Sequence, residues 1–247
     1  MPTRSALITG ASRGIGREIA HRLAADGYSL TLSARHERSL AEACEQLRAA
    51  SNVEISSVPC DLRNDDDVHR LAAAHGDRFG GTLDLLVLNA GVATDGAVAD
   101  VSMKSVDLTL NVNFRAQFLL VQDALPLLRK AAAARPDHGG KVIALSSITG
   151  LVSEPNLAAY GASKAALVSL CETVTQEEYV NRVTASAVCP GYVDTDMTTT
   201  IRESLDRGDM LTAADVAEIV MAITRLSARA VVPSVALTRA GRNLWRA

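Results

Sequence analysis

Tyr160 and Lys164 have the side-chain types and the spacing that suit proton transfer, since they lie four positions apart in the stretch Ala159-Tyr160-Gly161-Ala162-Ser163-Lys164-Ala165. If this stretch is helical, the phenol and the ammonium lie one turn apart on the same face. A free tyrosine, with a pKa of about 10, is a poor proton carrier at neutral pH, but a fixed positive charge nearby stabilises its phenolate. Such a tyrosine would protonate an alkoxide as it forms. The same spacing also arises by chance on helix surfaces, so the surrounding elements must decide.

The chain that carries this pair has 247 residues, a length typical of single α/β domains. Its hydrophobic content of 48% is enough for a sizeable core, and its net charge of -3 gives no reason to bind nucleic acid or an anionic membrane. It has neither the pattern of a signal peptide nor the ~18 consecutive apolar residues of a membrane span. We therefore expect a cytoplasmic protein with a single domain over residues 1–247.

The cysteines and histidines show no pattern of metal ligands. The four cysteines, which are Cys44, Cys60, Cys171 and Cys189, are widely spaced and form no C-x-x-C pair. The five histidines form no H-E-x-x-H set. We interpret the cysteines as small buried hydrophobic residues and expect no metal.

A glycine-rich turn follows the first apolar run of the chain. Residues Ala6 to Thr9 read as a strand, Gly10 to Gly16 carry the pattern T-G-x-x-x-G-x-G, and Ile19, Ala20 and Leu23 recur at helical spacing. Glycines let a backbone approach a phosphate closely, and a helix N-terminus offers free N–H groups and a favourable dipole. The turn therefore indicates a phosphate site, although ordinary glycine-rich βα turns look similar.

Further apolar strands alternate with amphipathic helices along the chain. The expected strands are 28–33, 53–58, 83–88, 141–146, 183–188 and 231–237, and the expected helices are 37–50, 65–79, 103–133, 160–178 and 213–226. This alternation predicts an α/β fold, a Rossmann-type doubly wound parallel sheet of about seven strands with helices on both faces. Its ligand should lie across the carboxyl ends of the strands.

Polar residues stand where such a ligand would bind. Arg35 follows the second strand, Asp61 follows the third, Asn89-Ala90-Gly91 follows the fourth and Ser147 follows the fifth. Turn chemistry alone also favours Asp, Asn and Gly at strand ends. We expect Pro190 to end the sixth strand, because proline cannot continue a central ladder. The polar stretch from Tyr192 to Leu211 is then expected to be a lid.

Taken in order, the motifs resemble those of the short-chain dehydrogenases/reductases. They are Thr9-Gly10-Ala11-Ser12-Arg13-Gly14-Ile15-Gly16, Asn89-Ala90-Gly91, Ser147, Tyr160-x-x-x-Lys164 and Pro190-Gly191, within a likeness that covers about residues 4–226. The ending departs from this family, because Arg239 to Trp245 replaces its glycine-rich C-terminus. The resemblance implies a cofactor-binding part at about 1–150 and a catalytic and substrate part at about 140–247.

The resemblance implies a catalytic group of Asn113, Ser147, Tyr160 and Lys164. Ser147 would bind the substrate oxygen and Tyr160 would exchange a proton with it, while hydride passes between the substrate carbon and a nicotinamide. Lys164 would bind the nicotinamide ribose and lower the Tyr160 pKa, and Asn113 would hold a water in the proton relay. The implied cofactor-binding residues are Gly10, Ser12, Arg13, Gly14, Ile15, Gly16, Arg35, Asp61, Leu62, Asn89, Ala90, Gly91, Tyr160, Lys164, Pro190, Gly191, Val193 and Thr195.

The residue that ends the second strand bears on the choice of cofactor. NAD enzymes of this fold place a carboxylate there, and that carboxylate repels a 2′-phosphate. Here the position is Ala34, and Arg35 and Arg13 lie close enough in the pattern to hold a phosphate. We therefore expect NADP(H) as cofactor.

The expected function is an oxidoreductase that acts on a small carbonyl or secondary alcohol. The alternative is an NADP(H)-binding redox sensor or scaffold with little turnover, but such proteins tend to lose the tyrosine or the lysine. A hydrolase would need G-x-S-x-G after a strand, which the chain lacks, and a methyltransferase has no use for Tyr160 and Lys164. Small and apolar surfaces on the helices 103–133 and 160–178 predict a homodimer or homotetramer.

Overall fold

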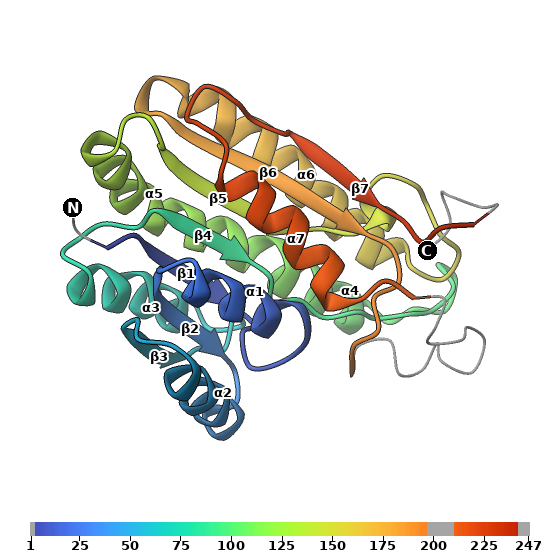
Figure 1. The fold of residues 1–247 in the computed structure, drawn as a ribbon. Coiled ribbons are helices and arrows are strands. Elements are labelled where there is room, and N and C mark those ends of the chain that lie inside the picture. Colours follow the sequence, from blue (N-terminus) through green and yellow to red (C-terminus); the bar gives the residue numbers. More distant parts are fainter. Residues whose placement is uncertain (1–2, 197–209, 242–247) are drawn as a thin grey trace.

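The computed structural model describes residues 3–196 and 210–241, which form a seven-stranded parallel sheet of order β3-β2-β1-β4-β5-β6-β7 (Figure 1). The strands are β1 (Ser5–Thr9), β2 (Ser29–Ala34), β3 (Ile55–Pro59), β4 (Leu85–Leu88), β5 (Gly140–Leu145), β6 (Val183–Pro190) and β7 (Ser234–Leu237). The helices are α1 (Gly14–Ala25), α2 (Glu37–Ala50), α3 (Asp65–Arg78), α4 (Met103–Leu110), α5 (Ala116–Ala134), α6 (Ala158–Glu177) and α7 (Ala213–Thr224). The expected doubly wound Rossmann-type sheet is confirmed.

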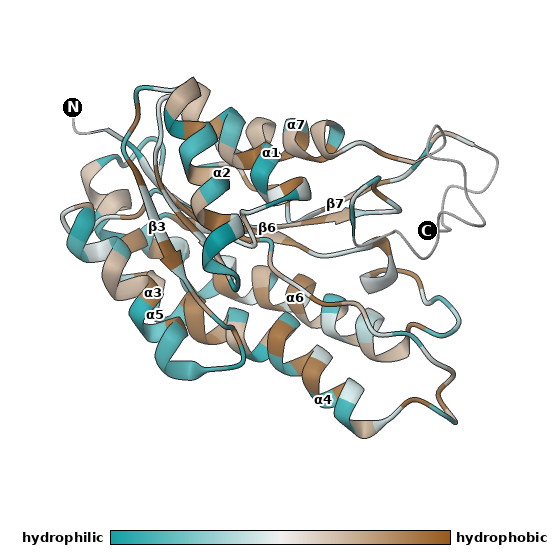
Figure 2. Ribbon diagram, turned by 90° about the horizontal axis from the view of Figure 1, so that it is seen from below, coloured by the Kyte–Doolittle hydropathy of each residue, from teal (hydrophilic) through white to brown (hydrophobic). Residues whose placement is uncertain are grey.

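Helices cover both faces of this sheet. Helices α1, α2 and α7 pack on one face, and α3, α5 and α6 pack on the other (Figure 2). Successive residues of a strand enter opposite layers, so Ile8 packs in the cluster with α1 while Leu7 packs in the cluster with α5. Both are fully buried, which explains why the strands read as continuous apolar runs.

The expected helix over 103–133 is present but is not one regular α-helix, because a π-helical turn, η1 (Asn111–Arg115), lies between α4 and α5. A π turn inserts an extra residue into the helical ladder and is common at functional sites. Asn113, at the centre of this turn, is fully buried rather than solvated. Its side chain reaches the backbone of Val92, which gives the insertion a tertiary partner.

Two strand boundaries also differ from expectation. Strand β6 continues through Pro190, which pairs with Leu237 of β7. The ladder between β5 and β6 ends at Val188, and Gly191 donates its N–H to Leu237 at 2.8 Å. Pro190 is tolerated because the side toward which its missing N–H would point carries no ladder. Strand β7 begins only after Pro233, which likewise has no N–H to contribute.

Two other expectations are tested only in part by the described ranges. Residues 197–209 of the expected lid and residues 242–247 of the tail lie outside them.

The four cysteines are free and buried, which confirms their interpretation as small core residues. Within the described residues, no helix combines the length and the apolar character that a bilayer crossing requires.

A buried histidine lies at the amino end of the sheet, away from the strand ends that bind ligand. His75 of α3 is fully buried, with Nδ1 2.8 Å from Thr31 Oγ1 and Nε2 3.2 Å from the Thr82 carbonyl oxygen. Burial lowers the pKa of this imidazole to about 4. The folded state therefore requires neutral His75, whereas the unfolded chain protonates it near its ordinary pKa of about 6.5.

We expect stability to fall as the pH drops from about 6.5 toward 4, because only the unfolded state gains a proton at His75 in that window. The loss at pH 5 relative to pH 7 should be about 2 kcal/mol from this group alone. Urea unfolding at the two pH values measures it. His75→Gln should remove that share of the loss, and the exposed control His36→Gln should keep it. Equal pH dependence in wild type and His75→Gln would contradict the assignment.

Candidate functional site

The glycine-rich turn between β1 and α1 is shaped by its packing against Asn89. Gly10 and Gly14 have φ values of 65° and 56°, which side chains rarely tolerate. A Cβ at Gly16 would lie 2.4 Å from Asn89 Nδ2 and 2.5 Å from the Gly10 carbonyl oxygen. That amide donates to the carbonyl oxygens of Thr9 at 2.9 Å and Gly10 at 3.0 Å. The glycines therefore let β1 and the end of β4 close on one another.

A cavity of about 950 Å³ opens along the carboxyl ends of the strands. Of the sequence-predicted residues, its lining includes Gly10, Ser12, Arg13, Gly14, Ile15, Arg35, Asp61, Leu62, Asn89, Ala90, Gly91, Ser147, Tyr160, Lys164, Pro190, Gly191, Val193 and Thr195. Two predicted residues, Gly16 and Asn113, stand behind its wall. The structure thus brings nearly all the predicted site residues to one cavity.

Tyr160, Ser147 and Lys164 meet at one end of this cavity. Burial raises the pKa of the Tyr160 phenol, and a hydrogen bond with the Ser147 side chain partly opposes that shift. Lys164 Nζ lies 5.6 Å from the centroid of the Tyr160 ring and donates to the Leu145 carbonyl oxygen at 2.7 Å. Burial lowers the pKa of this ammonium to about 8. The tyrosine therefore stays protonated at neutral pH, and the expectation that Lys164 lowers the Tyr160 pKa is not met, because burial of the phenol has the larger effect.

Asn113 connects the wall of the cavity to the start of α6. Its Oδ1 accepts from the Val92 N–H at 2.8 Å, and its Nδ2 donates to the Val92 carbonyl oxygen at 2.8 Å. Nδ2 also donates to Ser163 Oγ at 3.0 Å, and that hydroxyl donates to the Tyr160 carbonyl oxygen at 2.7 Å. Asn113 thus acts on the helix that carries Tyr160 through one intermediate hydroxyl.

Cationic side chains gather at the other end of the cavity. Arg35 follows Ala34 and donates to His36 Nε2 at 2.9 and 3.2 Å. Arg13 pairs with Asp196 at 3.2 Å, and both side chains are largely exposed. This end therefore presents guanidinium groups from the first two strand ends.

Sequence reasoning missed several lining residues. At the cationic end they are His36, Arg38, Ser39, Glu42 and Arg63, and near the catalytic end they include Thr149 and Leu157. Four of these residues lie at the start of α2, just after Arg35 and the end of β2. Their closeness in sequence to that strand end was the signal that could have identified them. Arg63 holds Asp61 by a hydrogen bond at 2.9 Å, which keeps the pKa of that carboxyl below its usual value.

Comparisons with known proteins agree with this geometry. Residues 4–206 match the family described as short chain dehydrogenase. The chain is 33% identical over 210 residues to the 3-oxoacyl-[acyl-carrier-protein] reductase FabG of Staphylococcus aureus, which covers 85% of this chain and 82% of that protein.

Solved structures show the same likeness. A short-chain dehydrogenase of Burkholderia cenocepacia in complex with NADP superposes with a TM-score of 0.83 at 28% identity and covers 96% of each chain. A variant of actinorhodin polyketide ketoreductase with NADPH gives a TM-score of 0.85 at 29% identity, covering 96% of this chain and 97% of that one. The sheet order, the site at the strand ends and these matches together place the chain in the short-chain dehydrogenase/reductase family of oxidoreductases.

Proposed function

We propose that this protein is an NADP(H)-dependent oxidoreductase that interconverts a carbonyl compound and a secondary alcohol. The observation that carries the proposal is one cavity with Tyr160, Ser147 and Lys164 at one end and Arg13 and Arg35 at the other. NADP(H) needs both ends, because its nicotinamide must lie beside the proton-transfer residues while its 2′-phosphate must lie beside cationic side chains.

The residues of the cavity suit a dinucleotide. Gly10 and Gly14 leave open backbone at the N-terminus of α1, where N–H groups and the helix dipole favour a pyrophosphate. A Cβ at Gly14 would come within 3.3 Å of the Thr195 side chain. Glycine at position 14 therefore keeps open the narrow gap between the turn and Thr195. When bound, the nicotinamide would supply or accept the hydride.

The residues at the catalytic end would handle the proton. During reduction, the Tyr160 hydroxyl would donate its proton to the carbonyl oxygen, and the Ser147 hydroxyl would donate a hydrogen bond to the same oxygen. The Lys164 ammonium would stabilise the phenolate that remains and bind a ribose hydroxyl. Asn113 would hold a water in the proton relay and would fix the helix that carries Tyr160 through Ser163. In oxidation the proton would move in the opposite direction.

Tyr160→Phe should abolish turnover, because the variant keeps the ring but has no proton to donate. The loss should be at least ~100-fold in kcat, while NADPH binding stays within a few-fold of normal. NADPH oxidation with a panel of ketones and aldehydes measures the first, and fluorescence titration measures the second. A variant that keeps more than about a tenth of the activity would contradict the role of Tyr160.

The cofactor preference rests on Ala34, Arg35 and Arg13. Ala34 removes the carboxylate that would repel a 2′-phosphate, and both arginines line the cavity at the end of the first two strands. Arg13 pairs with Asp196 and Arg35 contacts His36, and both arginine side chains are exposed. Each guanidinium could form charge-assisted hydrogen bonds with a phosphate, which carries more negative charge than either of these partners. NADPH is therefore the expected cofactor.

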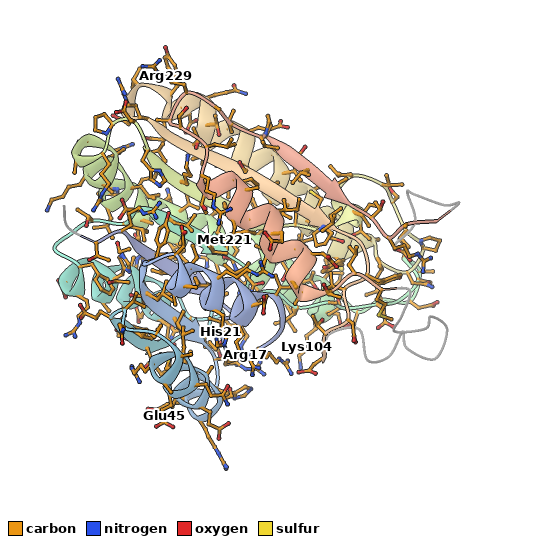
Figure 3. All side chains as sticks on the ribbon, viewed as in Figure 1. Arg17, His21, Glu45, Lys104, Met221 and Arg229 are labelled. Atoms are coloured by element: carbon orange, nitrogen blue, oxygen red, sulfur yellow. The ribbon has the colours of Figure 1, made fainter. Side chains whose placement is uncertain are left out.

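Arg35→Ala and Arg13→Ala should each weaken NADPH by about ten- to a hundredfold and leave NADH nearly unchanged, because each removes a charge-assisted hydrogen bond of roughly 1.5 to 3 kcal/mol. The ratio of kcat/KM for the two cofactors measures the effect. Arg17→Ala, an exposed arginine of α1 outside the cavity lining, is the matched control (Figure 3). A wild type that prefers NADH, or two variants with the wild-type ratio, would refute the assignment.

A homo-oligomer is the second part of the proposal. Phe114 and Phe118 lie 6.0 Å apart between ring centroids on the adjoining η1 and α5 segments, and Phe118 is 41% exposed. Ala162 of α6 is exposed as well. Apolar and small side chains on helix faces suit contact with a second copy.

We expect sedimentation at micromolar concentration to give twice or four times the chain mass of 26.0 kDa. Phe118→Asp should shift the equilibrium toward the monomer, because a charge on that surface would be desolvated on association. A wild type that sediments as a clean monomer would contradict the oligomer.

A further inference from the structure

A hydrogen bond joins two loops that flank the catalytic end of the cavity. Tyr192 lies just beyond the carboxyl end of β6, and Glu154 lies between the 3-10 turn η2 (Ile148–Gly150) and α6. The Tyr192 hydroxyl donates to Glu154 Oε1 at 2.8 Å. Tyr192 lines the cavity, whereas Glu154 stands outside its lining. The hydroxyl thus leads away from the cavity, and the aromatic ring is the part of Tyr192 that the cavity meets.

The loop that holds Glu154 follows a fixed course. Asn156 adopts a left-handed conformation with φ 66°, and its carbonyl oxygen accepts from the Gly96 N–H at 2.9 Å. The Leu157 N–H donates to the Glu154 carbonyl oxygen at 3.3 Å, just before α6 begins. These backbone contacts just after Glu154 make it a suitable fixed point for another side chain.

The Glu154 carboxylate is poorly satisfied apart from its contact with Tyr192. Its second oxygen, Oε2, is buried and has no hydrogen-bond partner among the residues that the structure describes. A buried carboxylate oxygen without a partner lowers stability. Because Glu154 lowers stability in this way, a role in positioning Tyr192 explains its presence better than a role in stabilising the loop.

Tyr192 differs from Tyr160 in what it can do. Burial, followed by the hydrogen bond to Glu154, raises the pKa of the Tyr192 phenol above its ordinary value. Its proton is engaged by Glu154 outside the cavity, so Tyr192 is no second proton donor for a substrate. Its contribution to the cavity is shape and apolar surface.

The cavity is also lined by apolar side chains, of which Leu157 belongs to the same loop as Glu154. They are Val92, Ala93, Leu108, Val112 and Leu157. A charged substrate group placed against the Tyr192 ring and such side chains would lose hydration without gaining a hydrogen-bond partner from them.

We propose that Tyr192 determines substrate specificity, with Glu154 as its positioning residue, so that the enzyme selects carbonyl compounds that bear an uncharged apolar group over those that bear a carboxylate. This inference rests on the proposed oxidoreductase function and names the substrate class of the same site. The hydrogen bond to Glu154 holds the Tyr192 ring in a position where it forms part of the apolar surface of the cavity. Without that bond the ring would move, and the apolar group of the substrate would bind more weakly.

The test measures NADPH oxidation with 2-heptanone and with 6-oxoheptanoate, a ketone of the same chain length that ends in a carboxylate. We expect kcat/KM for 2-heptanone to be at least about tenfold higher in the wild type. Tyr192→Phe should raise KM for 2-heptanone about three- to tenfold, with kcat and the NADPH dissociation constant nearly unchanged. A KM effect with unchanged kcat separates positioning from proton transfer and from loss of structure.

Variants of Glu154 complete the design. Glu154→Ala should match Tyr192→Phe, Glu154→Gln should stay close to the wild type because an amide oxygen still accepts the bond, and the double variant should be no worse than either single one. Tyr179→Phe, on the exposed turn after α6, and Glu45→Gln are the controls. Glu45 projects from α2, far across the molecule from the loop between β5 and α6 (Figure 3).

The outcomes separate the two levels of the proposal. If the wild type is active but favours 6-oxoheptanoate, or if Tyr192→Phe leaves both KM values unchanged, the specificity assignment is overturned. If the effects of Tyr192→Phe and Glu154→Ala multiply, Glu154 is not the positioning residue. If the wild type oxidises NADPH with no ketone or aldehyde in a broad panel, the failure belongs to the proposed function itself. Tyr192→Phe changes one hydroxyl, so it keeps the test valid even where Glu154→Ala fails to fold.

Discussion

At the carboxyl ends of β1 and β4, the Asn89 amide occupies the space that side chains at positions 10 and 16 would need. Its two donated hydrogen bonds fix the turn on which the N-terminus of α1 begins. The turn that we propose to bind phosphate therefore takes its shape because two strands that are distant in sequence approach within hydrogen-bond distance of one amide. The carboxyl ends of β2 and β5 align with these two strands through the parallel ladder.

The catalytic end depends on a second amide, that of Asn113. It satisfies both backbone groups of Val92 and passes its remaining hydrogen bond to Ser163, so the cavity wall and α6 are held by one buried side chain. Lys164, which is buried one residue further along the helix, keeps its ammonium on the Leu145 carbonyl oxygen. A charged amine is stable in such a place only with oxygen partners close by. The end of β5 and helix α6 thus together hold the polar side chains at this end of the cavity in place.

Much of the fold could be predicted from the sequence because short strand-like runs alternate with helical patterns, and several runs end at Gly, Asn or Ser, as Leu85 to Leu88 end at Asn89. The pairing of Tyr160 with Lys164 was visible in their spacing, whereas the proposed roles of Ser147 and Asn113 came from the family resemblance alone. The burial of Asn113 did not, because a π turn in mid-helix depends on a partner, Val92, that the helical pattern does not reveal. Pro190 was misread because sequence shows that proline lacks an N–H but not where the neighbouring ladder ends. The contact of Tyr192 with Glu154 joins loops whose separation in sequence leaves no local signal.

The π turn at Asn111–Arg115 has a consequence for the rotational phase of the helices around it. One inserted residue turns everything that follows by about 100° about the helix axis relative to an uninterrupted α-helix. Phe118 therefore faces outward, Phe114 packs half-buried against the core, and Val112 and Ala116 are buried, only with this insertion in place. If the π turn relaxed to a regular α-helix with the sequence unchanged, hydrophobicity and length would stay almost the same. The side chains of α5 would nevertheless turn by about 100° around the axis, so that some residues now buried against the sheet would become exposed.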